Sequence, residues 1–350
     1  MKDTARRAFV ASAIFVGVVA AALALWKLKL LIALVFFGFV IAAAMRPGVE
    51  LLNRYGIPRV AAVLTHYAAL LGLIGLLFYF VVPTAQTQIT EALPTSRSEL
   101  NRATKRSTGI KHQILKGIQQ RLKKLPSAGK IVNTGLSVGV RAFEILVAIF
   151  FVFASAAYWI FERDRAERVV LSLLPPRRRK LVRDTWNLID LKLGAFVRGQ
   201  LVLVAFVATV LSLAFWAIGL NFWLLIGVFA GIVELVPVIG PLLAGTVAVG
   251  VGLTQSWQVA LVAGLVVLAV RLLEDYVVIP KVLGDAVGLT PLTVLFSVAA
   301  VTFLFGGFAV LLAIPFVAVL VTLMDVIIFN KNPAEEDVPT VLFPAKEAEN

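Results

Sequence analysis

Three charged residues stand close together between two long apolar runs of the chain. Arg271, Glu274 and Asp275 fall within about one and a half helical turns. Their spacings of three and four residues place both carboxylates on the same helix face as Arg271, so an internal ion pair is available. Two roles stay open: a salt bridge where the helix leaves the membrane, or a carboxylate that faces a pathway and takes up a proton or sodium. A carboxylate at membrane depth costs roughly 2.5–3.5 kcal/mol and usually faces the interior of a helix bundle.

A fourth charge, Glu234, lies inside the segment GIVELVPVIGP with apolar neighbours on both sides. Pro237, Gly240 and Pro241 follow it, and proline removes a backbone donor and disfavours helical angles in the residue before it. We expect a helix break here, which a bilayer tolerates only where protein or a water-filled cavity satisfies the freed groups. Glu234 is therefore a candidate proton carrier, or else a carboxylate that caps the freed amides without titrating.

Two further interruptions follow towards the C-terminus. Pro280 and Pro291, together with two glycines between them, predict a turn that redirects the chain. Gly306 and Gly307 split the last apolar run, and Pro315 is expected to split it again. We include these prolines and glycines in the candidate pathway because they predict broken backbone at membrane depth.

Several classes of function find no support in the sequence. The chain has no cysteine and only two distant histidines, which excludes thiol chemistry and makes a metal site improbable. No nucleophile–base–acid pattern or phosphate-binding loop is present, so we do not expect an enzyme. The net charge of +13 suits the flanks of membrane helices, where lysine and arginine gather on the cytoplasmic side, better than a nucleic-acid partner.

The composition instead predicts an all-α polytopic membrane protein. Of 350 residues, 60% are hydrophobic and 15% charged, against roughly 45–50% and about 25% in a soluble domain. Lipid is then the natural solvent for much of the chain. We expect about eight membrane segments, some of them broken or re-entrant, with basic amphipathic helices between spans.

The apolar runs divide the chain into five regions. Residues 1–82 contain three membrane spans, although the first run, 9–26, is also open to the alternative of a signal peptide. Residues 83–135 are polar and basic with one amphipathic helix, and 136–200 hold a span and a cytoplasmic amphipathic helix. Residues 201–329 form a core of broken helices, and 330–350 are an acidic cytoplasmic tail.

The order of these runs predicts that both termini are cytoplasmic. The broken pairs 222–254 and 292–329 each return to the side they left, whether they cross fully or are re-entrant. Opposed re-entrant hairpins that meet near the midplane are one arrangement expected of secondary transporters. Gly227 and Gly231, four residues apart, permit close helix packing. The basic run 177–180 is interpreted as a topology anchor, with a binding site as the alternative.

Four segments of the second half are distinctive as a set: LGAFVRGQLVLVAF, GIVELVPVIGPLLAG, LEDYVVIPKVLGDAVGLTPLTVLFSVAAV and FLFGGFAVLLAIPFVAVL. Together they resemble the autoinducer-2 exporter family of bacterial inner-membrane transporters, and the resemblance is clearest over 193–321. It implies a polytopic permease in the inner membrane, with substrates in the family that range from a small polar furanone to sodium and protons in antiport. Many relatives carry a polar residue without charge where this chain has Asp275.

The sequence leaves three alternative functions for this protein. The first is a carrier that exports a small polar solute, and the second is a sodium (cation)/proton antiporter that uses Glu234 and Asp275. The third is a membrane scaffold without transport, expected if the broken helices prove continuous. We expect lipid as the surrounding partner, H⁺ or Na⁺ as the only candidate coupling ion, and a homo-oligomer.

Overall fold

The computed structural model describes residues 2–92, 128–236, 239–282, 290–336 and 338. Within these residues every regular element is a helix, and six helices are long and apolar enough to cross a membrane. These features confirm the all-α polytopic membrane class. The amphipathic helix expected in 83–135 falls mostly outside the described residues. The first five helices are α1 (Lys2–Lys27), α2 (Lys29–Arg54), α3 (Arg59–Ala92), α6 (Ala128–Ser172) and α7 (Pro176–Ala217).

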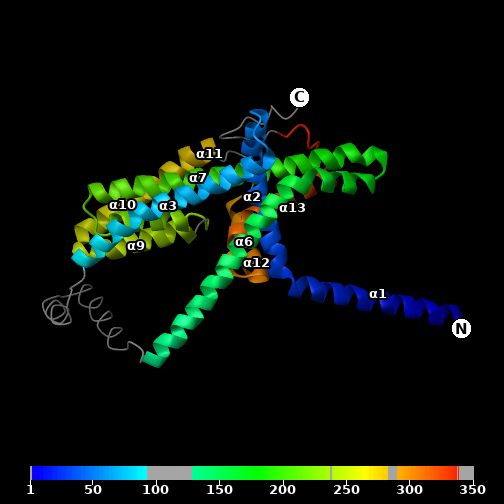
Figure 1. Cartoon of the computed structure of the whole chain (residues 1–350), viewed down its shortest axis with the longest axis horizontal. Helices are drawn as coiled ribbons and strands as arrows, with labels where there is room; N and C mark the ends of the chain where they lie inside the picture. Colours follow the sequence, from blue (N-terminus) through cyan, green and yellow to red (C-terminus); the bar gives the residue numbers. More distant parts are fainter. Residues whose placement is uncertain (1, 93–127, 237–238, 283–289, 337, 339–350) are drawn as a thin grey trace.

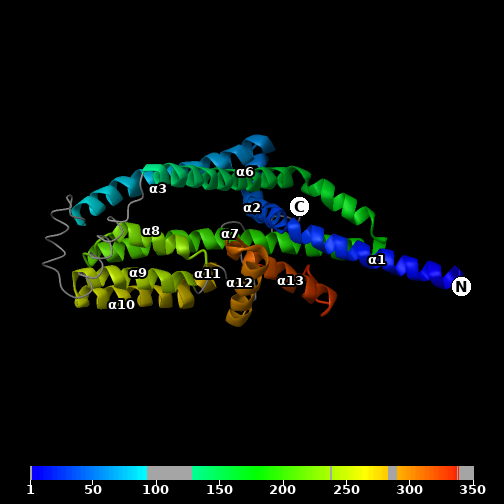
Figure 2. The same cartoon turned by 90° about the horizontal axis from the view of Figure 1, so that it is seen from below.

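Three short helices form a bundle with the second half of α7. They are α8 (Trp223–Val233), α9 (Ile239–Gln255) and α10 (Trp257–Leu273) (Figures 1 and 2). Helices α8 and α10 pack against α7, and α9 packs against α8 and α10. Small residues let α7 and α8 approach closely: a Cβ placed on Gly231 would lie 2.6 Å from the Cβ of Ala208. The close packing predicted from Gly227 and Gly231 is thus present, and it builds one end of the molecule into a compact bundle.

The two ends of this bundle differ in construction. At one end the Gln255 side chain donates a hydrogen bond to the Gly219 carbonyl (3.0 Å) and accepts one from the Asn221 amide (2.9 Å), which ties the α9–α10 turn to the α7–α8 turn. At the other end α8 stops at Val233, after 11 residues. Such a helix is about 16 Å long, well short of a hydrocarbon core of roughly 30 Å. The break expected near Glu234 is therefore present.

A second interrupted pair crosses α7 near its middle (Figure 1). Its elements are α12 (Pro291–Phe305), the 3₁₀ turn η2 (Gly307–Leu312) and α13 (Ala313–Ile327). Gly306 joins the first two with φ of 99°, a conformation that favours glycine. The second break expected at Pro315 is wrong, because Pro315 lies in the first turn of α13, where proline costs no intrahelical hydrogen bond.

The N-terminal helices join this arrangement through α2. Ala43 of α2, Leu193 of α7 and Leu312 of η2 share one buried cluster, so α2 contacts both α7 and the second interrupted pair. By contrast, α1 extends away from the other helices, and none of its apolar window is buried (Figures 1 and 2).

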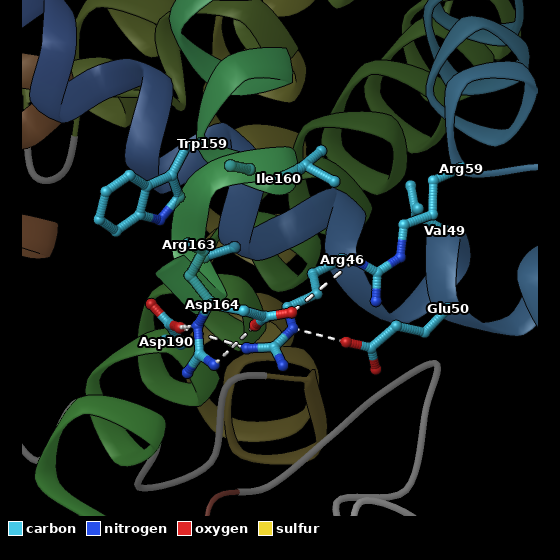
Figure 3. Close-up of a pocket in the computed structure, with 11 residues that line it drawn as sticks. Arg46, Val49, Glu50, Arg59, Trp159, Ile160, Arg163, Asp164 and Asp190 are labelled. Carbon is cyan, nitrogen blue, oxygen red and sulfur yellow. Dashed lines mark hydrogen bonds and ion pairs between the residues drawn. The ribbon is translucent and has the colours of Figure 1, made fainter. Parts of the chain in front are cut away.

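A network of ion pairs and hydrogen bonds joins α2, α3 and α6 to the first half of α7. We call it the ion-pair hub and define it as Arg46, Glu50, Arg59, Arg163, Asp164, Glu167, Arg183, Asn187 and Asp190, of which Figure 3 draws all except Glu167, Arg183 and Asn187. Asp190 Oδ2 accepts from Arg163 Nε at 2.9 Å and from Arg46 Nη1 at 3.4 Å. Arg163 also donates to Glu167 (2.9 Å) and to Asn187, and its side chain is only 7% exposed. Bonds to several partners satisfy the buried guanidinium, so the hub is a structural joint.

The space enclosed by the hub is small. Its cavity measures about 50 Å³ and is lined by charged groups together with apolar residues such as Val49, Trp159 and Ile160 (Figure 3). A cavity needs roughly 10–15 Å³ of this volume to hold one water, so it has room for a few waters.

Asp190 is predicted to be the residue on which the hub depends. Asp190→Asn leaves two arginines facing a neutral amide, and unfolding free energy should fall by roughly 1–3 kcal/mol. Thermal unfolding of the purified protein in detergent measures the change. Asp164→Asn is the matched control, because Asp164 is 47% exposed and its contacts with Arg59 and Arg163 are long, at 3.7 and 3.5 Å. Equal unfolding temperatures for the two variants would contradict the assignment.

Candidate functional site

Three neighbouring charged side chains and a fourth from a distant part of the sequence meet at the end of the α7–α10 bundle where α8 stops. We call Glu234, Arg271, Glu274 and Asp275 the carboxylate cluster. Arg271 Nη1 lies 3.2 Å from Glu234 Oε1 and 3.3 Å from Glu274 Oε2, so two carboxylates contact the same nitrogen. Arg271 Nη2 lies 2.8 Å from Asp275 Oδ1. The ion pairs that the sequence allowed along one helix face are present, and Glu234 joins them from α8.

The cluster combines deep burial with an excess of negative charge. The side chains of Glu274 and Glu234 are 3% and 7% exposed, whereas Asp275 is 40% exposed. Three carboxylates face one guanidinium, a formal charge of −2 when all are ionised. Moreover, Glu274 Oε1 is buried and has no hydrogen-bond partner among the described residues. An unsatisfied buried carboxylate oxygen is costly, and a bound proton removes that cost.

The backbone is irregular on both sides of the cluster. After Leu273 the chain forms a π-helical turn, η1 (Glu274–Val278), in which the Ile279 amide donates to the Glu274 carbonyl. Single π turns inside α-helices occur often at functional sites. Facing it, α8 ends and the Glu234 carbonyl accepts a hydrogen bond from Gln200 Nε2 at 3.0 Å. Both buried glutamates therefore sit where a helix stops being regular.

The prolines and glycines predicted as site residues build the irregular segments around the cluster. Gly240 is buried in the first turn of α9, and a Cβ there would come within 3.0 Å of the Glu234 Cα, so the return of the chain requires glycine. Pro241 follows in the same turn, while Pro237 lies outside the described residues. Pro280 stands in α11 (Ile279–Val282), directly after the π turn.

The remaining predicted residues belong to the second interrupted pair. Pro291 begins α12, and Gly306 and Gly307 separate it from α13. They contribute to the α12–α13 turn that packs on α2, and not to the carboxylate cluster.

Gln200 was missed as a site residue, although the segment FVRGQ contained it. It lies on α7, seventeen residues before the helix ends at Ala217. A long amide at the start of an apolar run is a signal that could have identified it, because such a group needs a partner at membrane depth. The sequence does not show that Gln200 lies close to Glu234, because the two residues meet only through the close packing of α7 on α8.

The cluster is suited to exchange a proton. The guanidinium already occupies the position that a metal cation would take among the carboxylates, so a cation would have to displace it. A proton, in contrast, neutralises one glutamate and leaves Arg271 paired with the others. Buried like charges that share a counter-ion are a known means of holding a proton reversibly.

Comparison with known proteins agrees with this picture of a transport protein. Residues 13–329 match a family model described as AI-2E family transporter. Two proteins of Bacillus subtilis (strain 168), named "Putative transport protein YrrI" and "Putative transport protein YueF", are each 26% identical to this chain. The alignments cover 81% and 82% of this chain and 83% of each relative. A third relative, "Putative transport protein MT0215" of Mycobacterium tuberculosis (strain CDC 1551 / Oshkosh), is 24% identical over 87% of this chain and 86% of its own length.

The family match spans nearly the whole chain, from the first apolar helix to the end of α13. It includes both interrupted pairs and all four residues of the carboxylate cluster. The scaffold alternative was expected if the broken helices proved continuous, and they are interrupted after Val233 and at Gly306. The family match also favours transport. The chain belongs to the AI-2E family of membrane transporters.

Proposed function

We propose that this protein is a proton-coupled secondary transporter that exports a small polar solute, with the carboxylate cluster as its proton site. The observation that carries the proposal is the sharing of one Arg271 nitrogen by two buried glutamates, Glu234 and Glu274. The small polar solute is supported by the family, whose name refers to autoinducer-2.

The coupling follows from the charge balance of the cluster. A proton that binds Glu234 or Glu274 reduces the formal negative charge of the cluster from −2 to −1 and releases the ion pair between that glutamate and Arg271. Because Glu234 ends α8 and Glu274 begins the π turn after α10, this release loosens the contact between two interrupted helices. Proton entry and solute exit are then linked through one local change of packing.

Neutral glutamine at either position tests the proton site. Glu234→Gln and Glu274→Gln should each lower proton-driven flux to the level of protein-free vesicles, because both residues share one guanidinium. The measurement is autoinducer-2 movement in proteoliposomes under an imposed pH gradient, with an interior pH dye. Glu162→Gln, at a position 49% exposed beside Arg165, is the matched control and should retain wild-type flux.

The same vesicles separate the proposal from its alternative. Sodium/proton antiport by the cluster predicts a pH change driven by a sodium gradient alone, without added solute. If both glutamine variants assemble normally and keep wild-type flux, the cluster does not carry the proton and the proposal fails.

We also infer that the protein lies in the bacterial inner membrane with both termini cytoplasmic. The α9–α10 turn then faces outward, and the end of the bundle with the carboxylate cluster faces inward. The absence of native cysteine makes single cysteines informative. In intact cells Gln258→Cys, at an exposed position, should react with an impermeant maleimide. Lys281→Cys, also exposed, should react only after the cells are opened. The reverse pattern would contradict the orientation.

A homo-oligomer remains part of the proposal. Its support is the fully exposed α1, which packs little against the rest of the protomer. Light scattering coupled to size-exclusion chromatography should give a protein mass of several protomers, and a monomer mass would contradict it.

A further inference from the structure

An apolar groove of about 360 Å³ lies between α2, α6, α7 and α13, on the far side of Trp159 from the ion-pair hub. Its walls include Phe36 of α2, Val182 of α7 and Leu323 of α13. The volume falls within the range of about 300–1,000 Å³ that is typical of small-molecule sites. The groove accepts an apolar ligand, because nearly all of its walls are aliphatic or aromatic.

Stacked aromatic rings form one wall of the groove. Phe39 stacks on Trp159 with centroids 4.1 Å apart, and Trp159 stacks on Trp186 at 5.9 Å. All three line the groove. Tryptophan is enriched at membrane–water interfaces, where its ring meets the headgroups. The stack therefore indicates the level at which a lipid headgroup would lie.

Positive charge stands at the mouth of the groove. Leu181 and Val182 line it, and the exposed run Arg177–Lys180 comes directly before them. Arg178 precedes Val182 by four residues and so continues the same face of α7 by one turn. Basic residues beside apolar pockets on the cytoplasmic side suit anionic headgroups.

The described end of the chain, up to Val338, does not line the groove. Val338 packs against Leu188 and Ala195, and Glu336 pairs with Lys192. Leu188 is turned by about 100° from Ile189, a groove residue, so Val338 and Glu336 lie against a neighbouring face of α7. The acidic group in the groove, Asp190, is already bonded to Arg163 and Arg46, which leaves an apolar chain as the matching ligand.

We propose that the groove binds one acyl chain of an anionic phospholipid from the cytoplasmic leaflet, with Arg178 at its phosphate. This site is separate from the carboxylate cluster and does not rest on the proton-coupled mechanism. It gives the basic run a ligand, whereas the sequence favoured a topology anchor over a binding site.

Quenching by brominated lipids tests the proposal, because bromine on an acyl chain quenches tryptophan on contact. Trp186 is kept as the single tryptophan, with Trp159 and the other four replaced by phenylalanine. The full-length protein is placed in phosphatidylcholine nanodiscs that contain equal small fractions of dibromo-phosphatidylglycerol or dibromo-phosphatidylcholine. The anionic lipid should quench Trp186 more strongly. Arg178→Gln should lower that preference by about fivefold, as expected for one basic residue near the surface.

Lys180→Gln is the matched control, because it removes the same charge from the opposite side of α7 and should leave the preference unchanged. Equal quenching by the two lipids, or equal effects of the two variants, would overturn the anionic site. Absence of quenching by either lipid would show that protein, such as a second copy of the chain, covers the groove, and would overturn it as well.

Discussion

The structure depends on one half-buried guanidinium, that of Arg271, which faces three carboxylates. Arg271 cannot fully compensate Glu234, Glu274 and Asp275, and two of these side chains are almost without solvent. In an apolar bundle such an imbalance is expensive unless a mobile positive charge completes it. The short α8, the π turn after α10 and the hydrogen bond from Gln200 all place polar groups at this point. The irregular backbone and the excess negative charge therefore belong together, because the ends of the regular helices bring polar groups to the place where the buried carboxylates need polar partners.

The rest of the molecule divides into a fixed part and a part with interrupted helices. Residues of α2, α3, α6 and the first half of α7 are joined by the ion-pair hub, in which Asp190 links Arg163 and Arg46. The bundle of α8, α9 and α10 is fixed at one end by Gln255 and ends at the carboxylate cluster at the other. Helix α7 runs through both parts, with Asp190 and Gln200 about 15 Å apart along it. A change of charge at the cluster thus acts on the bundle of α8, α9 and α10. The ion pairs of the hub keep α2, α3, α6 and the first half of α7 together.

The sequence predicted much of this architecture through simple physical signals. Long apolar runs identified the membrane helices, and prolines and glycines identified the interruption after Glu234 and that at Gly306. The spacing of Arg271, Glu274 and Asp275 predicted their ion pairs. Contacts between distant segments could not be predicted: Glu234 reaches Arg271 only because α8 and α10 end at the same level, and Gln200 reaches Glu234 through the small-residue packing of α7 on α8. The hub was missed because the excess of basic residues was attributed to the flanks of membrane helices, and the break expected at Pro315 was wrong because a single proline does not reveal whether it lies inside a helix or in its first turn. The roles of the predicted site residues in transport stay predictions.

The most direct test of the shared proton is infrared difference spectroscopy of the protein in lipid, recorded as pH is changed. A protonated carboxyl group gives a C=O band distinct from that of carboxylates. The account predicts one titrating carboxyl band in the wild type that is lost or displaced in both single variants, Glu234→Gln and Glu274→Gln, since the proton belongs to the pair. A band that persists unchanged in both variants, or a wild type without such a band, would contradict the account.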